Sequence, residues 1–223
     1  MKKMLIKIYR KLPLSFRKKI KNLLKKDTNK DRLTIDDIVK KSKKYDIVSF
    51  DIFDTLITRC IYEPDDAFKI LGNLIKDEKF IEKRKKAEQQ ARKKLEHDVN
   101  LDEIYDEYML ENSLSKEKTS ILKNNEIKLE KDLLVPRKDM CILLKKLKEK
   151  NKKVILVSDM YLTKKAIIDI LNNCGYKDLY DALYLSCDVN KRKDSKTMWT
   201  FLKKIHTKEK ILHLGDNDLS DVQ

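Results

Sequence analysis

Glycine and proline are scarce in this chain of 223 residues, which contains three of each. This scarcity excludes collagen-like repeats, Gly/Ser linkers and all-β folds rich in tight turns, and it favours helices. No apolar run reaches the roughly 18 residues of a membrane-spanning helix, and the N-terminus lacks the continuous apolar segment of a signal peptide. The four cysteines are scattered without a C-x-x-C pair, which is typical of reduced thiols rather than of a zinc site. These absences predict a cytoplasmic protein.

Charged residues, by contrast, make up 40% of the chain, and their signs are unevenly distributed. Residues 1–45 contain 17 lysines and arginines but only four acids, a balance of +13. Residues 46–223 contain 35 basic and 33 acidic residues, so nearly all of the net charge of +15 lies in the first fifth of the chain. We interpret residues 1–45 as a basic amphipathic arm with a linker, followed by a nearly neutral domain.

The arm has the pattern of an amphipathic helix. Residues 1–26 contain eleven cations and no acid, and their apolar residues recur at helical spacing on both sides of Pro13. This pattern is typical of a helix on an anionic membrane surface, here the inner face of the membrane. One alternative is a surface that binds a protein partner. Another is a helix that packs on the domain and leaves its lysines solvated. Nucleic acid is the least favoured partner. In the linker, Thr34 is expected to cap a short helix over 35–39.

Beyond the linker, short apolar runs alternate with helical patterns. The expected strands cover residues 47–50, 154–157, 182–185 and 211–214. The expected helices between them cover residues 140–147, 166–171 and 198–205. This alternation predicts an α/β fold with a parallel sheet and helices on both of its faces. Residues 60–135 show three helical stripes and no strand pattern, which predicts a helical insertion after the first strand.

Polar side chains follow three of the expected strands, at the edge where parallel sheets bind ligands. These side chains are Asp51, Asp54, Thr55, Ser158, Asp159, Asp216, Asp218 and Asp221. Clustered carboxylates require a cation because like charges repel, and Mg²⁺ prefers carboxylates, water and phosphate as ligands. Hydroxyls and the basic stretch 191–193 suit phosphoryl oxygens. The sequence thus predicts Mg²⁺-assisted chemistry on a phosphorylated substrate, with one aspartate as the nucleophile.

Four motifs, in this order, resemble those of the haloacid dehalogenase (HAD) superfamily. They are SFDIFDTL at 49–56, VILVS at 154–158, KDSK at 193–196 and LHLGDNDLSD at 212–221. The resemblance implies a Rossmannoid core over 46–59 and 136–223 and a helical cap over 60–135. Within the superfamily, SFDIFDTLI and VSDMYL resemble a poorly characterised group of predicted hydrolases in bacterial polysaccharide and glycosyltransferase settings. The resemblance to this group therefore also implies a role in surface glycan biosynthesis.

The resemblance assigns a role to each matching residue. Asp51 would attack phosphorus and form an aspartyl-phosphate, and the substrate would be a small phosphorylated metabolite such as a sugar phosphate. The direct metal ligands would be Asp51, the backbone carbonyl of Phe53 and Asp216. Asp221 would be a ligand through water or would orient Lys193. The groups that hold the phosphoryl oxygens would be Thr55, Ser158, Asp159 and Lys193. Lys191 and Lys196 compete with Lys193 for this position.

Two features depart from the phosphatase pattern. Phe53 occupies the position of the usual general acid, whose loss typically costs about 10²–10⁴-fold in rate. On an extended segment Asp54 would point to the opposite face and would not replace it. The chain ends at Gln223, where the family usually continues with a helix and a strand. We therefore expect a truncated sheet, or a partner that covers its exposed strand.

These departures leave two alternatives to a Mg²⁺-dependent phosphatase. One is a weakly active or inactive, membrane-associated HAD-like binding module of a glycan-assembly system. The other is a dehalogenase, because members of the superfamily that act on carbon–halogen bonds also lack the aspartate that usually serves as general acid at the position of Phe53. Outside the motifs, Trp199 is expected in the core and His206 at the surface. Glu88 and Arg92 are expected to form a solvated ion pair one helical turn apart.

Overall fold

The computed structural model describes residues 33–217 and 221. The chain divides into two compact units, Met1–Ile38 and Val39–Gln223. The helical pattern expected over 1–26 lies outside the described residues. Helix α3 (Ile35–Ser42) begins after Thr34, as expected from the sequence. The Thr34 hydroxyl accepts a hydrogen bond from the backbone N–H of Asp37 at 3.2 Å, and the Asp37 carboxylate accepts one from the backbone N–H of Thr34 at 2.9 Å.

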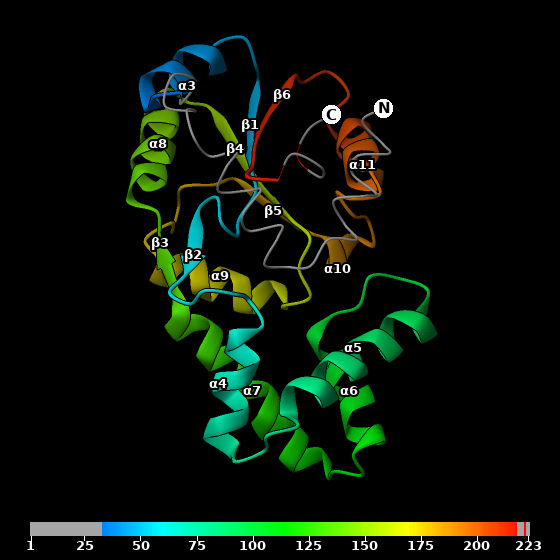
Figure 1. The fold of residues 1–223 in the computed structure, drawn as a ribbon. Helices are drawn as coiled ribbons and strands as arrows, with labels where there is room; N and C mark the ends of the chain where they lie inside the picture. The colour runs from blue at the N-terminus through cyan, green and yellow to red at the C-terminus, as the bar shows by residue number, and fades with distance from the viewer. Residues whose placement is uncertain (1–32, 218–220, 222–223) are drawn as a thin grey trace, which may run out of the picture. The chain divides into compact units, whose positions relative to one another are not determined.

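A four-stranded parallel sheet forms the centre of the second unit, in the order β5–β4–β1–β6 (Figure 1). Its strands are β1 (Ile47–Phe50), β4 (Lys153–Ser158), β5 (Ala182–Leu185) and β6 (Ile211–Leu214). Strand β1 pairs in parallel with both β4 and β6, and all four of its residues are buried. Strand β6 lies at one edge of the sheet among the described residues. The parallel α/β sheet predicted from the sequence is confirmed.

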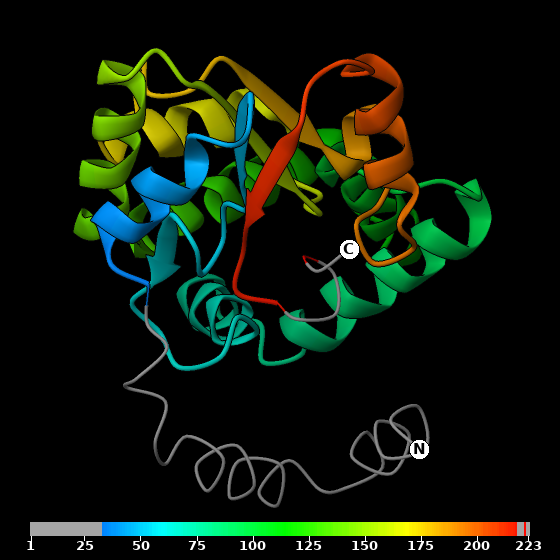
Figure 2. The same ribbon diagram turned by 90° about the horizontal axis from the view of Figure 1, so that it is seen from above.

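Helices cover both faces of this sheet, as Figures 1 and 2 show. On one face, α11 (Thr197–Ile205) packs Trp199 and Leu202 against Ile155 and Val157 of β4, which confirms the core position expected for Trp199. Helix α8 (Lys138–Glu149) packs against β4 from the other side. The remaining helices of this region are α9 (Lys164–Asn173) and the short α10 (Ser186–Val189).

A helical insertion connects β1 to α8. It contains α4 (Asp66–Ile75), α5 (Phe80–Leu95), α6 (Leu101–Glu111) and α7 (Lys116–Leu133). At its base, β2 (Ile57–Arg59) and β3 (Leu134–Pro136) form an antiparallel pair. The expectation of no strand over 60–135 is therefore wrong at its last two residues, because three residues are too few to show a strand period. Among the described helices, none is long and apolar enough to cross a membrane.

Candidate active site

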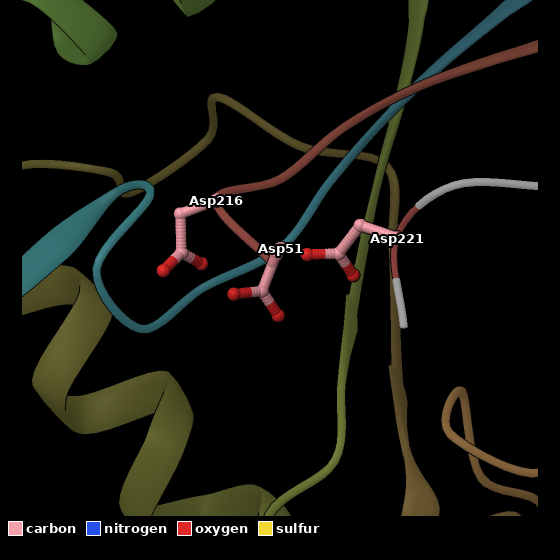
Figure 3. Close-up of side chains that lie close together, drawn as sticks. All are labelled: Asp51, Asp216 and Asp221. Atoms are coloured by element: carbon pink, nitrogen blue, oxygen red, sulfur yellow. The ribbon is translucent and has the colours of Figure 1, made fainter. Parts of the chain in front are cut away.

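The carboxyl ends of β1 and β6 bring three carboxylates together. Asp51 follows β1 directly, and its backbone N–H donates to the carbonyl of Leu214 at 2.9 Å. One oxygen from each of Asp51, Asp216 and Asp221 lies within 4.8 Å of the others. Figure 3 shows the three side chains close together, beyond the carboxyl ends of β1 and β6. Opposite ligands of an octahedral Mg²⁺ are about 4.2 Å apart. The three side chains can therefore ligate a divalent cation after a small adjustment. Asp218 lies outside the described residues.

Lys193 lies between two of these carboxylates. Its Nζ is 2.6 Å from Oδ1 of Asp51 and 2.7 Å from Oδ1 of Asp221, and the side chain is 4% exposed. Burial lowers the pKa of Lys193, but the two carboxylates more than offset this, so the pKa is raised and the amine is charged. Of the three candidate lysines, the structure places Lys193 beside the predicted nucleophile.

Burial dominates the ionisation of Asp51. Removal from water raises the pKa of Asp51 to about 6, and the charge of Lys193 offsets only part of this effect. For Asp221, burial also raises the pKa, but hydrogen bonds from His213 and Lys193 outweigh it and hold the pKa well below its usual value. The two carboxylates that share Lys193 therefore titrate in different pH ranges.

Ser158, Thr55 and Asp159, the other predicted phosphate-binding groups, have different surroundings. Ser158 ends β4 and lines the same cavity as Asp51. Thr55 is buried and its hydroxyl donates to Asp216 at 3.5 Å. Asp159 accepts the backbone N–H of Lys193 at 2.8 Å and that of Asp194 at 3.3 Å. Asp159 therefore holds the Lys193 loop, and it also lines the cavity, so its contact with phosphate stays a prediction.

The cavity around these groups has a volume of about 400 Å³ and admits a small molecule. Both Phe53 and Asp54 line it, so the expectation that Asp54 points away from it is wrong. That expectation assumed an extended segment. Asp54 instead has a φ of 58°, and the chain turns back on itself there. The backbone N–H of Asp54 donates to the carbonyl of Ile57 at 2.7 Å. Aspartate is one of the residues that tolerate this left-handed conformation.

Sequence reasoning gave no individual site role to three further residues that lie there. Arg59 lies over the Phe53 ring, 4.9 Å from its centroid, lines the cavity and pairs with Glu130 at 3.0 Å. Arg192 also lines the cavity. His213 joins Ser49 (2.9 Å) to Asp221 (3.3 Å), and burial lowers its pKa. The position of His213 in an apolar strand, within the fourth motif, was the available signal.

His206 was expected at the surface, and this expectation is wrong. Its side chain is only 7% exposed, and its Nδ1 lies 2.7 Å from Oε2 of Glu209. The ring also contacts Tyr184 edge-on, which explains its burial at the end of α11.

The comparisons with known proteins agree with this fold. Residues 45–223 match the family model of haloacid dehalogenase-like hydrolases, and the chain belongs to that family. Among solved structures, it is similar to the HAD-hydrolase YfnB from Bacillus subtilis bound to magnesium, at 14% identity and a TM-score of 0.53, over 80% of this chain and 82% of that chain. It is also similar to the L-2-haloacid dehalogenase from Xanthobacter autotrophicus with covalently bound chloropropionic acid, at 12% identity and a TM-score of 0.51, over 79% of this chain and 71% of that chain. A search of curated proteins gave no match.

Proposed function

We propose that this hydrolase cleaves a small phosphorylated metabolite through an aspartyl-phosphate on Asp51, with Mg²⁺ as cofactor. The observation that carries the proposal is the contact of the buried Lys193 with Asp51, inside a cluster of three carboxylates. A buried lysine beside the nucleophile suits an anionic phosphoryl group, which accepts hydrogen bonds from the ammonium. A place in surface glycan biosynthesis remains a prediction from the motif resemblance.

Asp51, Asp216 and Asp221 would hold the Mg²⁺, with the carbonyl of Phe53 as a predicted further ligand. Bound Mg²⁺ would neutralise phosphoryl oxygens and orient the group for attack. Asp51 then forms a bond from its carboxylate oxygen to phosphorus, while the bond from phosphorus to the leaving oxygen breaks. Ser158 and Lys193 hold the phosphoryl oxygens, and water afterwards cleaves the acyl phosphate to return Asp51 and release phosphate.

The leaving group determines which phosphorylated metabolites are favoured. A phosphatase usually protonates the departing oxygen with an acid two residues after the nucleophile, and Phe53 cannot do so. Substrates whose leaving oxygen is stable as an anion, such as acyl phosphates, phosphoanhydrides and aryl phosphates, need no proton. We therefore expect faster turnover of these compounds than of alkyl phosphates such as sugar phosphates.

The test is phosphate release from a panel of aryl, acyl and alkyl phosphates, with Mg²⁺ and with a chelator. We expect Mg²⁺-dependent release that falls by about 10³-fold or more in Asp51→Asn, because this change removes the nucleophile. In Phe53→Asp we expect alkyl phosphate hydrolysis to rise by about 10²-fold, with a smaller gain for aryl phosphates. Failure of the wild type to release phosphate from any compound would overturn the proposal.

Phe53 also favours a second candidate, a HAD-like module that binds metal and phosphate but turns over little. For this candidate we expect Mg²⁺-dependent binding of inorganic phosphate in a calorimeter, without hydrolysis of any compound in the panel. Turnover that Asp51→Asn abolishes would exclude it. Halide release from 2-haloacids that persists in the chelator would instead identify a dehalogenase.

A further inference from the structure

A buried aspartate of the helical insertion contacts the loop that carries Lys193. Asp98 lies between α5 and α6, and its side chain is 3% exposed. Its Oδ1 accepts a hydrogen bond from Arg92 of α5 and another, at 2.7 Å, from Nη1 of Arg192. Arg192 immediately precedes Lys193, so a single carboxylate joins the insertion to the loop at the active site.

Arg192 also contacts Asp194, the residue on the other side of Lys193. Its Nε and Nη2 donate to the two carboxylate oxygens of Asp194 at 3.0 and 2.7 Å. The guanidinium therefore bridges Asp98 and Asp194, which only a planar group with several fixed donors can do. The backbone of the same loop is held from the core by Asp159, which accepts the N–H groups of Lys193 and Asp194. The loop is thus fixed from both the core and the insertion.

Two backbone contacts keep the segment around Asp98 in place. The backbone N–H of Asp98 donates to the side chain of Asn190 at 3.1 Å. The backbone N–H of Leu101 donates at 2.7 Å to the carbonyl of Tyr161, two residues after Asp159. Tyr161 also packs against the cluster of Ala91, Val99 and Ile104 in the insertion. The segment therefore contacts the chain beside both Asp159 and Lys193.

We propose that Asp98 is a positioning residue, which couples the helical insertion to the Lys193 loop and so fixes the Lys193 ammonium against Asp51. The inference rests on the proposed function for the role of Lys193 in phosphate binding. The alternative is a pair that only adds stability. Asp98 is 3% exposed, whereas the side chains of Arg92 and Arg192 are 33% and 37% exposed. Loss of a partly buried ion pair that only adds stability would lower the stability of the whole domain, so a stability role alone predicts effects at all sites. A positioning role predicts local effects.

The first test is amide hydrogen exchange of the full chain in wild type and Asp98→Asn. We expect the amides of Lys193 and Asp194 to exchange about tenfold faster in the variant, while those of β1 and β4 are unchanged. The matched control is Asp102→Asn, which breaks an ion pair with Lys123 inside the insertion and should leave the loop unchanged. Equal exchange in wild type and variant, or acceleration at all sites alike, would overturn the proposal. If Asp98→Asn does not fold, Arg192→Lys gives the same test, because an ammonium cannot bridge both carboxylates.

The second test is calorimetric binding of inorganic phosphate in the presence of Mg²⁺. We expect Asp98→Asn to weaken phosphate binding about tenfold. This is the lower end of the effect of losing a partner that orients a ligand-binding group. Asp102→Asn should leave phosphate binding unchanged. A wild type that binds no phosphate would remove the proposed function, while the exchange experiment would still decide whether Asp98 holds the loop. Phosphate binding that is equal in wild type and Asp98→Asn would overturn the positioning role.

Discussion

The ionisation of Asp51 links the stability of the active site to its cation. The folded protein raises the pKa of Asp51 from 3.8 to about 6, chiefly through burial. A carboxyl whose pKa is higher in the folded state favours the protonated form there. The metal-free protein therefore loses stability as the pH rises from about 4 to about 6, where Asp51 ionises in the folded state. A cation that binds the ionised form offsets this loss.

Mg²⁺ affinity should depend on pH in the same range. Because Mg²⁺ and the proton compete for Asp51, we expect the affinity to be nearly constant above pH 7 and to fall by about tenfold per pH unit below pH 6. Calorimetric titration with MgCl₂ between pH 5 and 8 measures this dependence. Asp51→Asn is the control, in which binding should be weaker and the part of the slope due to Asp51 should be absent. An affinity of the wild type that stays constant down to pH 5 would contradict this assignment.

Single residues of the site differ in how far the sequence could predict them. Asp51, Ser158 and Asp216 lie at or within two residues of strand ends, so their meeting at one edge follows from the parallel topology. Lys193 lies beyond α10, so the sequence left it among three candidate lysines. The contact between Asp98 and Arg192 joins positions 94 residues apart, and neither residue belongs to a motif. Asp54 could not be placed either, because the positive φ that turns it into the cavity is not apparent from the sequence.

At the scale of elements, α7 was the helix that hydrophobic periodicity did not predict. Three of its inward-facing positions carry Thr119, Glu126 and Glu130 instead of apolar residues. The two glutamates pair with Arg84 and Arg59 at 2.9 and 3.0 Å, so ion pairs replace part of an apolar stripe. The sheet strands, by contrast, are short apolar runs and could be predicted almost residue by residue. Sequence patterns of this kind show apolar burial but not paired charges.

The pair of Arg84 and Glu126 should therefore determine how α5 and α7 are held together. Arg84 is fully buried, donates two hydrogen bonds of 2.9 Å to Glu126, and lies over the ring of Tyr105. Removing one partner leaves a buried charge uncompensated, so we expect Arg84→Met to lower the free energy of unfolding by about 3–5 kcal/mol. Urea unfolding measures this loss.

The double variant Arg84→Met/Glu126→Leu tests whether the lost stability comes from the uncompensated charge of Glu126. We expect it to recover most of the lost stability, because an apolar pair of similar volume is often as stable as a buried ion pair. Lys123→Met breaks an ion pair with Asp102, whose side chain is 56% exposed, and should cost about 1 kcal/mol or less. A double variant no more stable than Arg84→Met would show that the uncompensated charge of Glu126 is not the cause of the loss.

At the scale of the whole molecule, charge and chemistry lie in different parts of the chain. The three carboxylates of the site belong to residues 46–223, where acidic and basic residues nearly balance. The excess of positive charge lies in residues 1–45, and it is densest in 1–26, outside the described residues. We propose that the arm bears on where the domain is located rather than on the reaction, by binding an anionic membrane surface.

This separation predicts that membrane binding and hydrolysis can be altered independently. Each cation near an anionic surface contributes about 1 kcal/mol, so neutralising Lys18, Lys19 and Lys21 to Gln should weaken binding to phosphatidylserine-containing vesicles by roughly 10²-fold. Vesicle co-sedimentation of the full chain measures this binding, and binding of the wild type should decrease with salt.

The matched control neutralises three exposed lysines of the domain, Lys203, Lys204 and Lys208, and should bind nearly as wild type does. Phosphate release should be unchanged in both variants, because neither alters the site. Equal losses of vesicle binding in both would mean that net charge acts non-specifically and that the arm has no special role.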